Sequence, residues 1–199
     1  LHSFPTRRSS DLYSLDRTLI KEALTVIGFA DNTVGVMLHG RPNDGRWEYA
    51  VGAFDNVAFE KVGTAGTRES DELQPAGRIG FALLDPFPAP DGYADYKGSY
   101  LGEGQRLNLG FNAVRLGEAF EGPIEYDHLG ALGTDLFFNS GPYVFQTEFD
   151  WFVLDVVGDA DIQGDGWYVQ GGYILGCCGG TLIEAVARYQ TLDLDTSHE

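Results

Sequence analysis

Apolar and polar residues alternate with a period of two along most of this chain, which predicts β-strands with two chemically different faces. The alternation is clearest in residues 106–116, where leucine, phenylalanine and alanine alternate with arginine, asparagine and glycine. The same pattern predicts strands at 33–41, 46–53, 77–84, 129–139, 143–154, 166–174 and 181–192. We therefore expect an all-β protein whose neighbouring strands run antiparallel.

Turn signals and acidic stretches separate these strands. Clusters of glycine, proline, asparagine and serine predict short turns at 42–45, 140–142 and 176–180. Acidic stretches between the other strands are expected to be long loops at 55–75, 117–127 and 155–165. An alternation of short turns with long loops is typical of outer-membrane β-barrels. Residues 85–105 are an exception, because they lie where the alternation requires a short turn.

Two N-terminal segments differ from the rest of the chain. Residues 13–29 have helical spacing, with Leu15, Leu19 and Ala23 on one face of a short helix. Residues 1–12 are polar and basic and resemble translated adapter sequence, so they are excluded from the expected fold. Residues 13–199 are then expected to form one domain.

Charge and cysteine content exclude several classes of protein. The chain has 13 Lys+Arg against 30 Asp+Glu, a formal net charge of -17, which argues against a nucleic-acid partner. Cys177 and Cys178 are adjacent and close no useful loop, so a disulfide framework is excluded. No apolar run approaches the roughly 20 residues of a membrane-spanning helix.

The two predicted strand faces fit two architectures. Trp47, Tyr143, Trp167 and Tyr189 lie on the apolar face near strand ends, where aromatic girdles lie in membrane barrels. The other face is expected to carry Arg78, Arg106, Asn108, Asn112, Gln146, Glu148, Asp150, Gln170, Glu184 and Arg188. A soluble sandwich would bury the apolar face as its core, so the alternation leaves both architectures open.

Several segments in order along the chain resemble the phosphate-selective porin family of the O/P type. They are LDRTLIKEA at 15–23, TVGVMLHGR at 33–41, WEYAVGAFDN at 47–56, SYLGEGQRLNLG at 99–110 and GDGWYVQGGYIL at 164–175. The resemblance implies a trimeric, sixteen-stranded transmembrane barrel in the bacterial outer membrane. It implies part of a barrel for 13–199, a pore-loop segment at 13–29, and passive diffusion of small ions with no cofactor and no enzymatic activity. The implied partners are permeating ions, the lipid bilayer and lipopolysaccharide.

Candidate anion contacts follow from this resemblance. Arg17 lies in the segment that corresponds to the pore loop, and a guanidinium there would bind phosphate oxygens bidentately. Arg78, Arg106 and Arg188 would project from the polar face into the pore. The alternatives are a partner such as Asp16 or Glu22 for Arg17, and wall carboxylates such as Glu148, Asp150 and Glu184 for the other three. Because carboxylates favour cations, a general porin is a safer expectation than a phosphate-selective one.

The remaining motifs point to no metal, cofactor or catalysis. Asp159, Asp161 and Asp165 are spaced like the first ligands of a calcium loop, but Gln163 and Gln170 replace two oxygen ligands that such a loop requires. There is no nucleophile elbow and no phosphate-binding loop. We therefore expect no metal site. The alternative function is that of a soluble all-β module that binds a carbohydrate or another ligand.

Overall fold

The computed structural model describes most of the chain from residue 34 onward. The described ranges are 34–55, 73–86, 103–116, 119–121, 124–156, 161–176 and 182–195. The expected helix at 13–29, the segment 1–12 and the expected turn at 177–180 lie outside these ranges. Within them, no helix is long and apolar enough to span a membrane.

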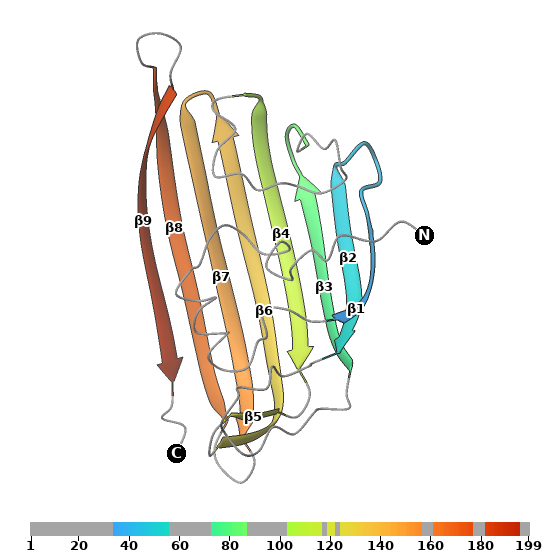
Figure 1. The fold of residues 1–199 in the computed structure, drawn as a ribbon. Helices are drawn as coiled ribbons and strands as arrows, with labels where there is room; N and C mark the ends of the chain where they lie inside the picture. Colours follow the sequence, from blue (N-terminus) through green and yellow to red (C-terminus); the bar gives the residue numbers. More distant parts are fainter. Residues whose placement is uncertain are drawn as a thin grey trace.

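The described residues form one antiparallel β-sheet (Figure 1). Its strands are β1 (Val34–Gly40), β2 (Trp47–Asp55), β3 (Leu73–Ala82), β4 (Gln105–Leu116), β5 (Ala119–Glu121), β6 (Ile124–Ser140), β7 (Tyr143–Val156), β8 (Ile162–Gly176) and β9 (Leu182–Asp195). The order across the sheet is β1-β2-β3-β4-β6-β7-β8-β9, and the short β5 pairs with β6 alone. The sheet therefore follows the chain from one strand to its neighbour.

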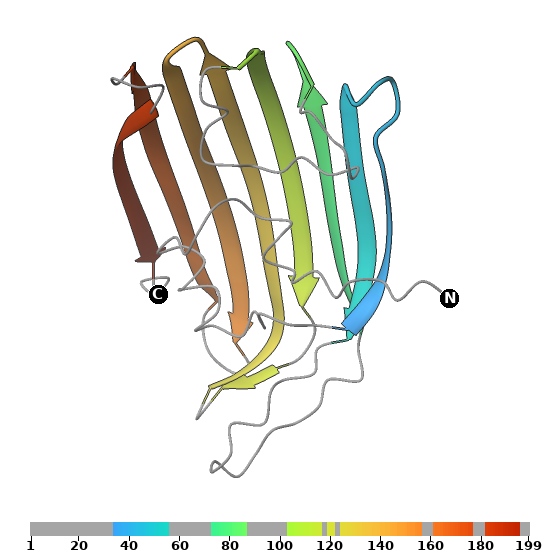
Figure 2. The ribbon, with the colours of Figure 1, turned by 45° about the horizontal axis from the view of Figure 1, so that its top comes forward.

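The sheet is open. Strands β1 and β9 lie at its two opposite edges and do not pair with each other. The sheet is twisted and curved, as the turned view shows (Figure 2). The expected all-β antiparallel fold is thus confirmed, whereas closure into a barrel is not seen among the described strands.

All eight segments with period-two alternation are strands in the structure, and two expected turns are confirmed. The turn between β1 and β2 places Asn43, Asp44 and Gly45 at φ 56, 54 and 81. Such left-handed backbone favours asparagine, aspartate and glycine, which explains the turn signal in the sequence. The turn between β6 and β7 consists of Gly141 and Pro142, with Gly141 at φ 53.

Two of the expected long acidic loops are shorter than predicted. Strand β7 continues to Val156 and β8 begins at Ile162, so the expected loop at 155–165 is only 157–161. The expected loop at 117–127 contains β5 and the start of β6. The long connection at 83–104 lies where the sequence predicts an exception to the alternation. The acidic residues misled the prediction because charge marks contact with solvent and not backbone conformation.

The strands divide their side chains between two faces, as the alternation predicts. We call one the polar face; the register places on it Glu48, Arg78, Arg106, Asn108, Asn112, Asp135, Asn139, Gln146, Glu148, Asp150, Gln170, Glu184 and Arg188. We call the opposite one the apolar face; it carries Val36, Leu38, Trp47, Tyr49, Val51, Ile79, Phe111, Leu132, Tyr143, Phe145, Phe149, Trp151, Trp167, Tyr173, Ile183 and Tyr189. The expected polar set lies on one face throughout.

The polar face is the more buried of the two, and it also carries buried hydrophobic side chains such as Phe137, Phe152 and Tyr168. On the apolar face Leu132 is 55% and Tyr189 65% exposed. On the polar face the buried side chains include Arg106, Asn108, Asp135, Asn139, Gln146, Glu148 and Asp150. Among the described residues no second layer covers the apolar face, because they form a single sheet.

Aromatic rings pack over glycines on neighbouring strands. Phe152 on β7 pairs directly with Gly164 on β8, and its ring lies where a Cβ of Gly164 would be. Tyr49 covers Gly40 in the same way, on the apolar face. The ring restores the packing that a strand glycine cannot supply. This pairing explains how Phe152 is 1% exposed in a single-layered sheet.

Candidate functional site

The three arginines expected on the polar face are placed there by different strands. Arg78 lies in β3, Arg106 at the start of β4 and Arg188 in β9. Arg17 lies outside the described residues. The three are spread across the sheet, and each has its own set of neighbours. They therefore do not form one cluster.

Arg78 makes a bidentate ion pair with Asp135 on β6. Its Nη1 donates to Oδ2 of Asp135 at 2.5 Å, and its Nη2 donates to Oδ1 at 2.9 Å. The Nε of Arg78 lies 3.9 Å from Oε1 of Glu48, and the other oxygen of Glu48 lies 3.9 Å from Nε of Arg41. The Arg78 side chain is only 7% exposed. A row of alternating charges therefore crosses the polar face from the β1–β2 turn to β6.

A glycine on the intervening strand makes room for this row. Gly110 on β4 pairs directly with Asp135, and a Cβ at Gly110 would meet the Asp135 carboxylate and the Arg78 guanidinium. Gly80 pairs with Glu48 but is not crowded in this way, because a Cβ there would lie 3.6 Å from the Cβ of Glu48, an ordinary contact distance. Gly110 is thus part of the site.

Two more carboxylates continue the row on β7. Glu148 pairs directly with Asp135, and Asp150 pairs with Gly133, whose missing side chain leaves space for the Asp150 carboxylate. Glu148 is within side-chain hydrogen-bonding reach of Asp150 and of Tyr168 on β8. The polar face at this level is therefore dominated by carboxylates.

Arg188 and Tyr168 form a contact at the far side of the same face. The Cζ atom of Arg188 lies 3.9 Å from the centroid of the Tyr168 ring, which is a cation–π geometry. Tyr168 is 2% exposed. The arginine thus lies over an aromatic ring and not against the carboxylates Glu148 or Asp150 named as alternatives. Glu184, the third of these, reaches over Gly172.

Arg106 contacts the backbone that leads into β4. Its Nη1 donates to the carbonyl oxygen of Glu103. The Nδ2 of Asn139 donates to the same oxygen at 3.1 Å and to that of Gly104 at 3.3 Å. Arg106 therefore anchors the end of the connection at 83–104.

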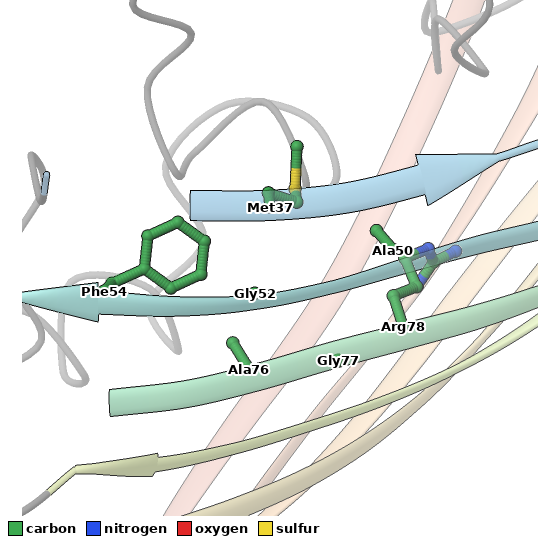
Figure 3. A pocket seen from close by; sticks show the side chains of 7 residues that line it. All are labelled: Met37, Ala50, Gly52, Phe54, Ala76, Gly77 and Arg78. Carbon is green, nitrogen blue, oxygen red and sulfur yellow. The ribbon is translucent and has the colours of Figure 1, made fainter. Parts of the chain in front are cut away.

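A shallow hollow lies on the polar face near the β1 edge (Figure 3). Its lining is Met37, Ala50, Gly52, Phe54, Ala76, Gly77 and Arg78. The side chains of Met37, Phe54, Ala76 and Arg78 rise on the same side of the strands in Figure 3. The hollow is almost entirely apolar, and its one charged member, Arg78, is the residue already paired with Asp135.

Calcium ligation receives no support from the described residues. Asp161 precedes β8 and Asp165 lies within it, whereas Asp159 is outside the described ranges. A calcium loop turns sharply at its sixth residue, but Gly164 lies in the extended strand β8. In the described part of the chain no group of three or more His, Cys, Asp or Glu could hold a metal.

Sequence analysis missed Asp135, the partner of Arg78, and Glu48. Within LGALGTDLFFN, Asp135 is a lone charge among apolar residues and glycines. The two-residue turn at 141–142 fixes the β6–β7 register, which pairs Asp135 with Glu148. The short turn is visible in the sequence, and the register that it fixes would have placed Asp135 on the polar face.

Comparisons with protein-family models, with curated proteins and with solved structures find no match for this chain.

Proposed function

We propose that this chain forms part of an outer-membrane β-barrel through which small ions and solutes diffuse passively. The observation that carries the proposal is the burial of the two faces. Apolar and aromatic side chains are exposed along one face, and charged side chains are buried on the other. Contact with hydrocarbon accounts for the exposed apolar face, and a barrel interior accounts for the charged side chains on the other face, because membrane barrels alternate apolar-out with polar-in.

The positions of two aromatic pairs agree with this proposal, whereas Trp167 and Tyr189, which were expected near strand ends, pair in the interior of β8 and β9. Trp47 and Phe81 form an edge contact at 4.4 Å, and Tyr143 and Tyr173 form another at 5.3 Å. Trp47 and Tyr143 are the first residues of β2 and β7, beside the two tight turns. Aromatic side chains gather at the membrane–water interface. We propose that this end of the sheet lies at such an interface.

The open edges add a requirement. Unpaired backbone groups along β1 and β9 cannot remain in hydrocarbon, because each unsatisfied group costs several kcal/mol there. Further strands must therefore complete the barrel in the membrane. A sixteen-stranded homotrimer of the phosphate-selective porin family, in contact with lipopolysaccharide, is the assembly that the sequence resemblance suggests.

The experiment that tests the proposal is insertion followed by conductance. The complete barrel, with the strands that close it, should float with phospholipid vesicles and stay dispersed only in detergent or lipid. Planar bilayers should then show ion conductance. Recovery of folded protein in solution without detergent, together with silent bilayers, would contradict the proposal. That result would favour a soluble all-β module that binds a carbohydrate or another ligand.

A further inference from the structure

Each arginine that the sequence singled out on the described polar face already has a partner within the protein. Arg78 contacts Asp135, Arg106 contacts the Glu103 carbonyl oxygen, and Arg188 lies over Tyr168. An arginine contributes to anion binding through its free N–H donors. The expected anion-lining role of these arginines therefore depends on how firmly each partner holds its arginine.

The Arg78–Asp135 pair uses the donors that an anion would need. Both terminal nitrogens of Arg78 donate to Asp135, in the fork geometry that guanidinium also uses for phosphate. The two side chains are 7% and 10% exposed. Gly110 lets them meet across β4, so the pair is built into the wall of the sheet.

We propose that Arg78 is a masked anion site, and that Asp135 is the specificity-determining residue that masks it. The inference rests on the proposed porin function. With Asp135 in place, both terminal nitrogens of Arg78 are held by its carboxylate, so Arg78 does not attract permeating anions. Without the Asp135 charge, the Arg78 guanidinium becomes available to phosphate or chloride.

The first test compares two substitutions that each remove one carboxylate from the polar face. Glu184 lies on the same face in β9, several strands away from Arg78. Asp135→Asn and Glu184→Gln each replace a carboxylate by an amide of the same shape. If net charge alone sets selectivity, both variants shift the reversal potential in a KCl gradient equally. The masked site predicts a larger shift toward anions for Asp135→Asn, and equal shifts would overturn it.

A second test measures the chemical reactivity of Arg78 directly and does not require a conductance measurement. Phenylglyoxal modifies accessible guanidinium groups, and peptide mass spectrometry reports the rate at Arg78. We expect slow modification in the unsubstituted protein, several-fold faster modification in Asp135→Asn, and protection of that variant by inorganic phosphate. Arg78 reacting equally fast in both proteins would overturn the inference.

Two outcomes separate the inference from the proposed function. Silent bilayers with the expected labelling difference would remove the porin function and leave the masking of Arg78 intact. Conducting bilayers, together with equal labelling of Arg78 in the unsubstituted protein and in Asp135→Asn, would support the porin function and remove the masking of Arg78. The double variant Arg78→Gln/Asp135→Asn completes the design, because it should lose the anion shift while keeping the circular-dichroism spectrum of Asp135→Asn.

Discussion

The carboxylate of Asp135 lies where the side chain of Gly110 would be. The two residues face each other directly in the register of β4 and β6. A Cβ at Gly110 would meet both the Asp135 carboxylate and the guanidinium of Arg78. The glycine is therefore the structural condition for an ion pair that joins β3 to β6 across the strand between them.

Gly110→Ala should break this arrangement. The added methyl group displaces Asp135 or Arg78, and overpacking of this kind costs about 1–3 kcal/mol. We expect the free energy of unfolding in urea, measured in detergent micelles, to fall by that amount. Gly130→Ala is the matched control, because nothing lies within 4 Å of a Cβ at Gly130. Equal losses for the two variants would show that the space at Gly110 has no special role.

Phe152→Ala tests the packing of rings over glycines. Phe152 is 1% exposed and covers Gly164, so its removal leaves a cavity and uncovers backbone. Buried Phe→Ala substitutions cost about 3–5 kcal/mol. Phe149→Ala on the same strand is the control, because Phe149 lies on the apolar face and is 45% exposed. Urea titration should give a clearly smaller loss for the control, and a larger one would contradict the prediction.

Leu132→Arg distinguishes a lipid-facing surface from a solvent-facing one. Leu132 is 55% exposed in the middle of the apolar face. In a bilayer an arginine at mid-depth costs about 2–4 kcal/mol, so the fraction of protein that floats with vesicles should fall. Leu132→Ala adds no charge and should float like the unsubstituted protein. Undiminished flotation of Leu132→Arg would place Leu132 outside the hydrocarbon.

Asn139→Ala should loosen the start of β4. Asn139 is fully buried and donates to the carbonyl oxygens of Glu103 and Gly104. Removing this donor loses its part-buried hydrogen bonds to these carbonyl oxygens, at a cost of about 0.5–1.5 kcal/mol. Hydrogen exchange at the Gln105 amide should become faster. Asn112→Ala, farther along β4, should leave the Gln105 amide unchanged; acceleration by both variants would argue against a local anchor.

The strands and the two faces were predictable because they depend on local pattern. A period of two fixes which residues share a face, and the left-handed residues Asn43, Asp44 and Gly45 identify the first turn. Burial was not predictable in the same way. Alternation shows that the faces differ, but only the arrangement of strands in space shows that Leu132 is exposed and Asp150 is buried.

The ion pair depended on information that local sequence does not carry. Arg78 and Asp135 are separated by 57 positions. Their meeting requires the register between β4 and β6, whose connection at 117–123 contains the short strand β5. The sequence thus supplied Arg78 as a candidate and left its partner unknown. The contact of Arg106 with the carbonyl oxygen of Glu103 was unpredictable for a similar reason, since backbone groups leave no mark in a sequence pattern.

The number of strands on the main path limits how the sheet can be completed. Eight strands follow one another with alternating direction, so β1 and β9, at opposite edges, point in opposite directions. A ring that keeps every neighbouring pair antiparallel has an even number of strands in total. Any set of strands that bridges the two edges must therefore itself be even in number, and an odd insertion would force one parallel junction into the ring.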